Sequence, residues 1–118
     1  MTPARTELIE IPLGDYGWDL VFTCYAAPIE AGVVVDITGY TVHFKVWKYN
    51  TPGTLLLNGT GALVDPTNGV ASYTLLNTDF VVGGSIGEIG KYEAEMECTK
   101  VGEKSSFRKC QLEVTASG

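Results

Sequence analysis

Positive charge is scarce in this sequence. The chain has 8 Lys and Arg residues against 14 Asp and Glu, and its net charge is −6. Nucleic acids and anionic membrane surfaces both attract clustered Lys and Arg, so this balance argues against either as a partner. Apolar runs long enough to span a bilayer are also missing. Residues 1–10 lack the basic start and apolar core of a secretory signal, so we expect synthesis in the cytoplasm.

Cysteine is limited to three residues, an odd number that cannot pair completely. A cytoplasmic origin predicts buried free thiols. Cys98 and Cys110 lie equally far from Lys104, so a hairpin centred there would place them opposite each other, and a disulfide between them stays open as an alternative. No CxxC pair occurs, and the single histidine, His43, is distant from every cysteine in the sequence. We therefore expect neither a metal site nor a cofactor.

Residues suited to catalysis do not form a recognisable pattern. His43 has no Ser, Cys or carboxylate partner at a known spacing. Asp15, Asp19 and Asp36 adjoin turns, where an aspartate side chain bonds neighbouring backbone; a calcium site in these loops is the alternative interpretation. We therefore expect that the protein is not an enzyme.

Alternation of apolar and polar residues is the strongest pattern that the sequence does contain. From Gly90 to Thr99, Tyr, Ala, Met and Cys alternate with Glu and Thr, which predicts a half-buried strand. Its three glutamates, Glu93, Glu95 and Glu97, are interpreted as a solvated face, with a contact surface for a basic partner as the alternative. A second alternating run covers Phe107 to Thr115, and the polar segment between the two runs predicts an antiparallel hairpin.

Shorter strand patterns recur along the rest of the chain. They cover residues 7–13, 19–26, 40–48, 54–57, 62–64 and 69–76. Turn residues separate them, and Asn58-Gly59 is interpreted as a hairpin turn. Many short strands with regular turns and no helical period predict an antiparallel β-sandwich of seven to nine strands. We expect one domain over residues 1–118, with residues 1–6 as a loose tail.

The segment Glu88-Ile89-Gly90-Lys91-Tyr92 matches the acidic-x-Gly-x-Tyr form of a tyrosine corner. In Ig-type sandwiches this tyrosine stands at the start of the penultimate strand and its hydroxyl bonds to upstream backbone. The alternative is that Tyr92 is an ordinary core residue. The corner interpretation makes the sandwich Ig-like, with Gly90, Tyr92, Cys98 and Cys110 as structural residues.

Three aromatic residues, Trp18, Trp47 and Tyr49, are candidates for an interface. Trp47 lies on the strand face opposite Val42, Phe44 and Val46, so we expect it to point outward unless a neighbour covers it. Exposed aromatics mark protein interfaces or sugar-stacking platforms. Packing of Trp47 under the Asn50 to Gly53 turn, or against a neighbouring strand, is the structural alternative.

Several motifs together resemble a known class of virion domain. They are Gly14-Asp15 before a strand, residues 36–46 (DITGYTVHFKV), residues 68–73 (NGVASY) and residues 90–95 (GKYEAE). The chain resembles the Ig-like N-terminal domain of upper-baseplate proteins from bacteriophages of Gram-positive hosts, and related small Ig-like virion domains. The likeness runs from about Asp15 to Val114 and rests on turn and strand patterns.

The resemblance implies a structural role. It implies a non-catalytic component of a phage or prophage tail or baseplate, synthesised in the bacterial cytoplasm and located in the virion. Such a subunit associates with itself and with other virion proteins. Two alternatives remain: a capsid-decorating Ig-like protein, and a carbohydrate-binding module that stacks Trp18, Trp47 and Tyr49 on a host surface glycan. An Ig-like fold by itself implies no function.

Overall fold

The structure, a computed structural model, describes residues 7–26, 31–51 and 53–116. These residues form two β-sheets and the short 3₁₀ helix η2 (Pro66–Asn68). Within the described ranges there is no helix with the length and hydropathy needed to cross a membrane. The protein is therefore all-β, as its alternating sequence predicts.

The larger sheet has five strands in the order β1-β8-β7-β3-β4. Their bounds are β1 (Glu7–Pro12), β3 (Thr41–Lys48), β4 (Leu55–Thr60), β7 (Gly90–Lys100) and β8 (Glu103–Thr115). All neighbours in this sheet are antiparallel except β1 and β8, which run parallel. Strand β7 is the central strand of this sheet, and it is hydrogen-bonded to β8 on one side and to β3 on the other.

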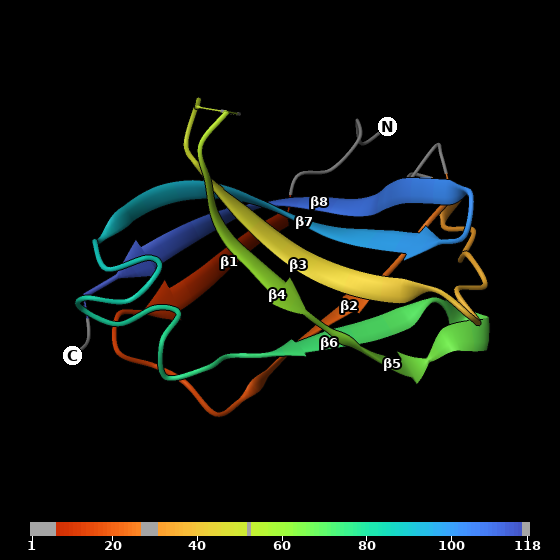
Figure 1. Cartoon of the computed structure of the whole chain (residues 1–118), viewed down its shortest axis with the longest axis horizontal. Helices are drawn as coiled ribbons and strands as arrows, with labels where there is room; N and C mark the ends of the chain where they lie inside the picture. The colour runs from red at the N-terminus through yellow and green to blue at the C-terminus, as the bar shows by residue number, and fades with distance from the viewer. Residues whose placement is uncertain (1–6, 27–30, 52, 117–118) are drawn as a thin grey trace.

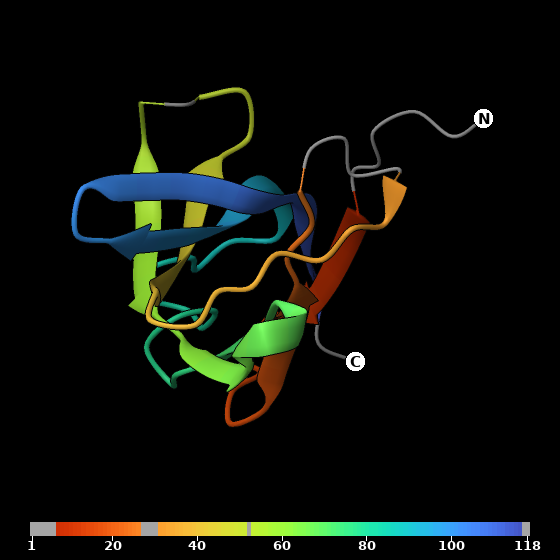
Figure 2. The same ribbon diagram turned by 90° about the vertical axis from the view of Figure 1, so that its right-hand side faces the viewer.

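The smaller sheet has three antiparallel strands in the order β2-β6-β5. Its strands are β2 (Asp19–Thr23), β5 (Ala62–Asp65) and β6 (Val70–Thr74). In Figure 1 strands β5 and β6 lie below β7 and β8, and Figure 2 shows the same two layers after a quarter turn. The two sheets pack face to face as a sandwich.

The core lies between the sheets and follows the alternation of the sequence. On β7, Tyr92, Ala94, Met96 and Cys98 are buried, as the period of two requires. At the centre, the Phe44 ring packs on the rings of Phe22 and Tyr73, both on the opposite sheet. The centroid of the Phe44 ring lies 5.5 Å from that of Phe22 and 5.1 Å from that of Tyr73. Aromatic contacts of this kind stabilise the sandwich beyond the area that they bury.

The C-terminal hairpin is longer than the sequence predicts. Strand β7 extends to Lys100 and β8 begins at Glu103, so the predicted polar loop over residues 100–105 is reduced to Val101 and Gly102. Gly102 has a φ of +77°, a conformation that glycine adopts at little cost. Because the turn precedes Lys104, the register differs from one centred on that residue.

The prediction of a hairpin turn at Asn58-Gly59 is wrong. Both residues lie within β4, where Asn58 pairs with Lys45 and Gly59 pairs with Phe44. A Cβ at residue 59 would come within 2.2 Å of the Tyr73 ring on the facing sheet. The glycine therefore makes room for an aromatic side chain rather than for a turn, and the chain changes sheets at Gly61.

Residues 75–89 form the long connection between β6 and β7 and contribute to the core. Phe80 and Ile86 are both buried, as is the carboxylate of Asp79. The Tyr73 hydroxyl donates a hydrogen bond to Asp79 Oδ2, and the Leu76 amide donates to the same oxygen at 2.9 Å. These bonds satisfy a buried charge and attach the connection to the smaller sheet.

Candidate functional site

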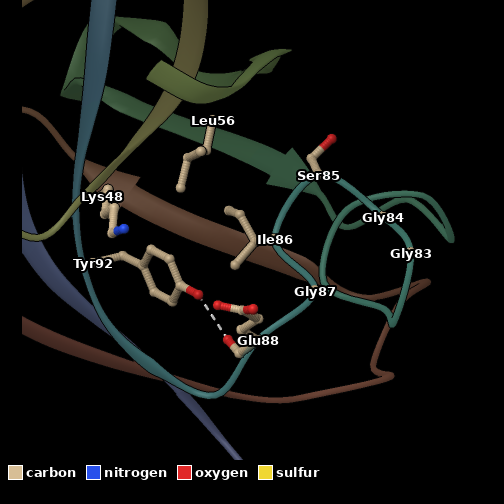
Figure 3. Close-up of a pocket in the computed structure, with 9 residues that line it drawn as sticks. All are labelled: Lys48, Leu56, Gly83, Gly84, Ser85, Ile86, Gly87, Glu88 and Tyr92. Carbon is tan, nitrogen blue, oxygen red and sulfur yellow. Dashed lines mark hydrogen bonds between the residues drawn. The ribbon is translucent and has the colours of Figure 1, made fainter. Parts of the chain in front are cut away.

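A cleft of about 420 Å³ opens beside this long connection. It is lined by Lys48, Leu56, residues 83–88 and Tyr92, which come from β3, β4, the connection and β7. In Figure 3 the side chains of Leu56, Ile86 and Tyr92 point toward one another. Its charged groups are one ammonium and one carboxylate, on Lys48 and Glu88. The lining also includes the hydroxyl-bearing residues Ser85 and Tyr92.

Tyr92 makes the hydrogen bond that the sequence predicts for it. Its hydroxyl donates to the backbone carbonyl oxygen of Glu88 at 2.7 Å, four residues upstream (Figure 3). Burial raises the pKa of the Tyr92 hydroxyl, and the nearby Glu88 carboxylate raises it further. Gly90, between them, has a φ of +150°, which side-chain-bearing residues rarely adopt. Both residues therefore shape the entry of the chain into β7.

The acidic face predicted for β7 is only partly solvated. Glu93 is exposed, whereas Glu97 is buried, with an exposed fraction of 6%. Lys45 on the adjacent strand β3 lies 2.9 Å from Glu97 (Nζ to Oε1). The interpretation of Glu97 as a solvated residue is wrong, because its carboxylate is buried and forms an ion pair with Lys45. His43 pairs with Glu97 across the strands and is half-buried.

The three loop aspartates are engaged in local hydrogen bonds. Asp15 Oδ2 accepts from Trp18 Nε1 at 3.2 Å, and Asp19 Oδ1 accepts from Thr74 Oγ1 at 2.6 Å. Asp36 Oδ1 accepts from the amide and the hydroxyl of Thr38, and these bonds lower the pKa of Asp36. Over the residues that the structure describes, no group of three His, Cys, Asp or Glu side chains is arranged to hold a metal ion.

The candidate aromatic residues do not form a single platform. Trp18 directly precedes β2 in the smaller sheet, is 38% exposed, and its carbonyl accepts from the Leu75 amide. Trp47 and Tyr49 lie at the end of β3 in the larger sheet. A glycan stacked on all three would have to contact both layers of the sandwich.

Trp47 and Tyr49 instead adjoin an open edge of the larger sheet. Trp47 is half-buried and pairs with Leu55 on β4, the last strand of that sheet, while its other neighbour is Glu93. Leu55 is 46% exposed and Tyr49 is 42% exposed. Among the residues that the structure describes, no strand pairs with the outer edge of β4, and these apolar side chains lie next to that edge. The sequence identified the two aromatics, but Leu55 was part of an unremarkable apolar run.

Strand β4, whose sequence is LLLNGT, has neither a charged side chain nor a proline to protect its edge, and its one irregularity is a register shift at Leu56 in its pairing with β3. The other edge strands do contain such features: β1 has Glu10 and Pro12, β2 has Asp19, and β5 has Asp65 beside a register shift. Backbone amides and carbonyls on an edge without charged residues or proline are a template for pairing with another strand.

The cysteines are free and buried, as predicted, but their arrangement differs from the predicted one. In the hairpin Cys110 pairs with Ala94 and Cys98 pairs with Ser105, so the two are not opposite each other. Cys98 instead contacts Cys24, just after β2 on the facing sheet. The sequence analysis did not single out Cys24, because its contact with Cys98 depends on how the sheets pack.

Comparisons with protein-family models and with curated proteins found no match for this chain.

Proposed function

We propose that this chain is an Ig-like, non-catalytic assembly component of a phage or prophage virion, in the tail or baseplate, and that copies associate through the edge of β4. The strand order supports the Ig-like part. In this proposal, β2, β6 and β5 would be strands B, E and D of that fold, and β8, β7, β3 and β4 would be strands G, F, C and C′. The virion part rests on the resemblance of the turn and strand motifs.

The observation that carries the proposed association is the open edge of β4. A second β4 placed alongside it would extend the larger sheet and satisfy backbone groups that otherwise bond water. The exposed Leu55 and Tyr49 would be covered in the same contact. Closed symmetric oligomers built from one such surface are the usual form of homo-oligomeric assemblies.

Light scattering after size exclusion, over a wide range of protein concentration, tests this proposal. We expect a discrete oligomer whose population rises with concentration. The variant Leu55→Lys places a charge beside the edge and should weaken the association at least about tenfold, because an ammonium at a paired edge must be desolvated. Val21→Lys is the matched control: Val21 is 63% exposed, but on β2 of the other sheet.

A wild-type chain that stays monomeric at every concentration would overturn the proposed self-association. Equal weakening by Leu55→Lys and Val21→Lys would move the contact away from β4. Circular dichroism of both variants checks that each retains the β-sheet fold.

A further inference from the structure

Lys48 stands at the end of a row of side chains that face the core. On β3, the side chains of Val42, Phe44 and Val46 are buried between the sheets. Residues two apart share a face of a strand, so Lys48 continues this row. It is exposed because the row ends at the cleft described above, where Lys48 pairs with Tyr92 on β7. The strand therefore places an ammonium group at the mouth of an apolar interior.

The cleft contains two side chains of opposite charge that are not joined to each other. Over the part of the chain that the structure describes, no ion pair involves Lys48 or the Glu88 carboxylate. Lys48 lies beside Tyr92 in the strand pairing. Glu88 lies at the far end of the Tyr92 side chain, where its carbonyl oxygen accepts a hydrogen bond from the Tyr92 hydroxyl at 2.7 Å. In Figure 3 the Tyr92 ring lies between the two charged groups, so they face one cavity from opposite ends of a ring.

Between the two charges the cleft is lined with apolar surface. The pairing of β3 with β4 shifts its register between Val46 and Trp47, which leaves Leu56 without a directly opposite residue. Such an irregularity redirects a side chain. Leu56 is half-buried, and it points toward Ile86 and Tyr92 in Figure 3. The floor of the cleft therefore favours an aliphatic or aromatic group.

Residues 83–88 form a rim that is held by backbone hydrogen bonds. The amides of Gly84 and Ser85 donate to the carbonyl oxygens of Val81 and Thr78 at 2.8 and 2.9 Å. A Cβ at Gly84 would come within 2.6 Å of the Thr78 carbonyl oxygen, so this close return of the chain requires glycine. A rim fixed in this way loses little conformational freedom when a ligand binds.

We propose that the cleft binds a small zwitterion with an apolar body, of the size of a dipeptide of apolar residues. The carboxylate of the ligand meets Lys48, its ammonium meets Glu88, and its side chains cover Leu56 and Ile86. The volume of about 420 Å³ is within the usual range for small-molecule sites. A neutral sugar would leave both charges of the cleft without a counter-charge, and a simple anion would face the Glu88 carboxylate. The site does not depend on the association proposed for the edge of β4.

Nuclear magnetic resonance of the isotope-labelled full-length chain tests this proposal. The probe is the dipeptide leucyl-leucine at about pH 6.5, where both of its ends are charged. The amide signals of Leu56, residues 83–88 and Tyr92 should shift with peptide concentration and reach saturation. The doubly capped peptide, N-acetyl-leucyl-leucine amide, has the same apolar body without the charges and should bind at least about threefold more weakly.

Variants assign each end of the peptide to its partner. Lys48→Met and Glu88→Gln each remove one charge and should weaken the binding of leucyl-leucine about threefold. N-acetyl-leucyl-leucine has no ammonium, so Glu88→Gln should not weaken its binding, whereas Lys48→Met should. Lys91→Met is the matched control: it removes an exposed lysine that adjoins Tyr92 on β7 but lies on the opposite face of the strand, and it should leave binding unchanged.

Three outcomes would overturn the proposal. An absence of saturable shifts at the cleft would show that it is not a site for such a ligand. Equal affinity for the free and the doubly capped peptide would remove the part assigned to charge. Equal weakening by Lys48→Met and Lys91→Met would attribute the effect to the net charge of the chain rather than to the cleft. The same spectra check that each variant is folded.

Discussion

Gly59 shows how one residue is determined by a side chain from another strand. It lies in the interior of β4, where glycine is unfavourable because it supplies no side chain and loses more entropy than other residues on folding. The Tyr73 ring of the facing sheet occupies the space of its missing Cβ. The strand therefore accepts a local cost so that the ring can pack on Phe44 in the core.

The substitution Gly59→Ala should lower the free energy of unfolding by about 1–3 kcal/mol, because the Tyr73 ring must move to admit the methyl group. Urea denaturation measures the change. Gly53→Ala is the control, since a Cβ there would meet no atom within 4 Å. If both variants unfold at the same urea concentration, the close approach of Gly59 and Tyr73 does not limit the packing.

Pairing between elements decides the environment of charged side chains. Lys45 on β3 and Glu97 on β7 are neighbours on the outer face of the larger sheet, and both are largely covered. An ion pair that is shielded from water is screened less than an exposed one, and removal of one partner costs more. The packing of β3 against β7 is thus partly electrostatic.

Lys45→Met should lower the free energy of unfolding by about 2 kcal/mol, because the buried carboxylate loses the ammonium beside it. The matched control is Lys100→Met, which removes a cation 3.7 Å from Glu103 in a pair that is nearly half exposed. The control should change stability by less than about 0.5 kcal/mol. Chemical denaturation at low and high salt measures the free energy of unfolding of both variants. An equal loss of stability in Lys45→Met and Lys100→Met would contradict the role assigned to burial.

At the scale of the whole molecule, three tyrosines make stability depend on alkaline pH. Burial raises the pKa of Tyr73 and of Tyr92, and the hydrogen bond to Glu103 raises the pKa of Tyr40. Each hydroxyl therefore keeps its proton in the folded protein at a pH where the unfolded chain, with an ordinary pKa of about 10, has lost it. The stabilisation is complete below pH 10 and is lost as the pH rises toward the folded-state values.

Urea denaturation over a series of pH values tests this dependence. The free energy of unfolding should fall as the pH rises above about 10, because the folded state then binds more protons than the unfolded one. Tyr73→Phe should make the fall less steep by removing one such group. An identical slope in that variant would show that the Tyr73 hydroxyl, with its bond to Asp79, does not contribute to it.

The sequence by itself determined the all-β class, the strands and the side chains that face the core. The reason is local: alternation sets which face of a strand is apolar, and the buried apolar residues of β7 and β8 follow it. It also identified Tyr92 and its backbone hydrogen bond, because that motif is contained within five consecutive residues. The sequence identified the aromatic candidates by residue type, but it did not indicate which of them share a surface.

Only the tertiary structure decided what depends on two segments that are distant in the chain. Asn58-Gly59 has the composition of a turn, yet packing against Tyr73 keeps it in a strand. The register of the hairpin separates Cys98 from Cys110, and the stacking of the sheets brings Cys98 to Cys24. The ion pair of Glu97 with Lys45 and the position of β4 at the edge of its sheet likewise follow from strand order. Such contacts arise from strand pairing within a sheet and from packing between the two sheets, which local propensity does not encode.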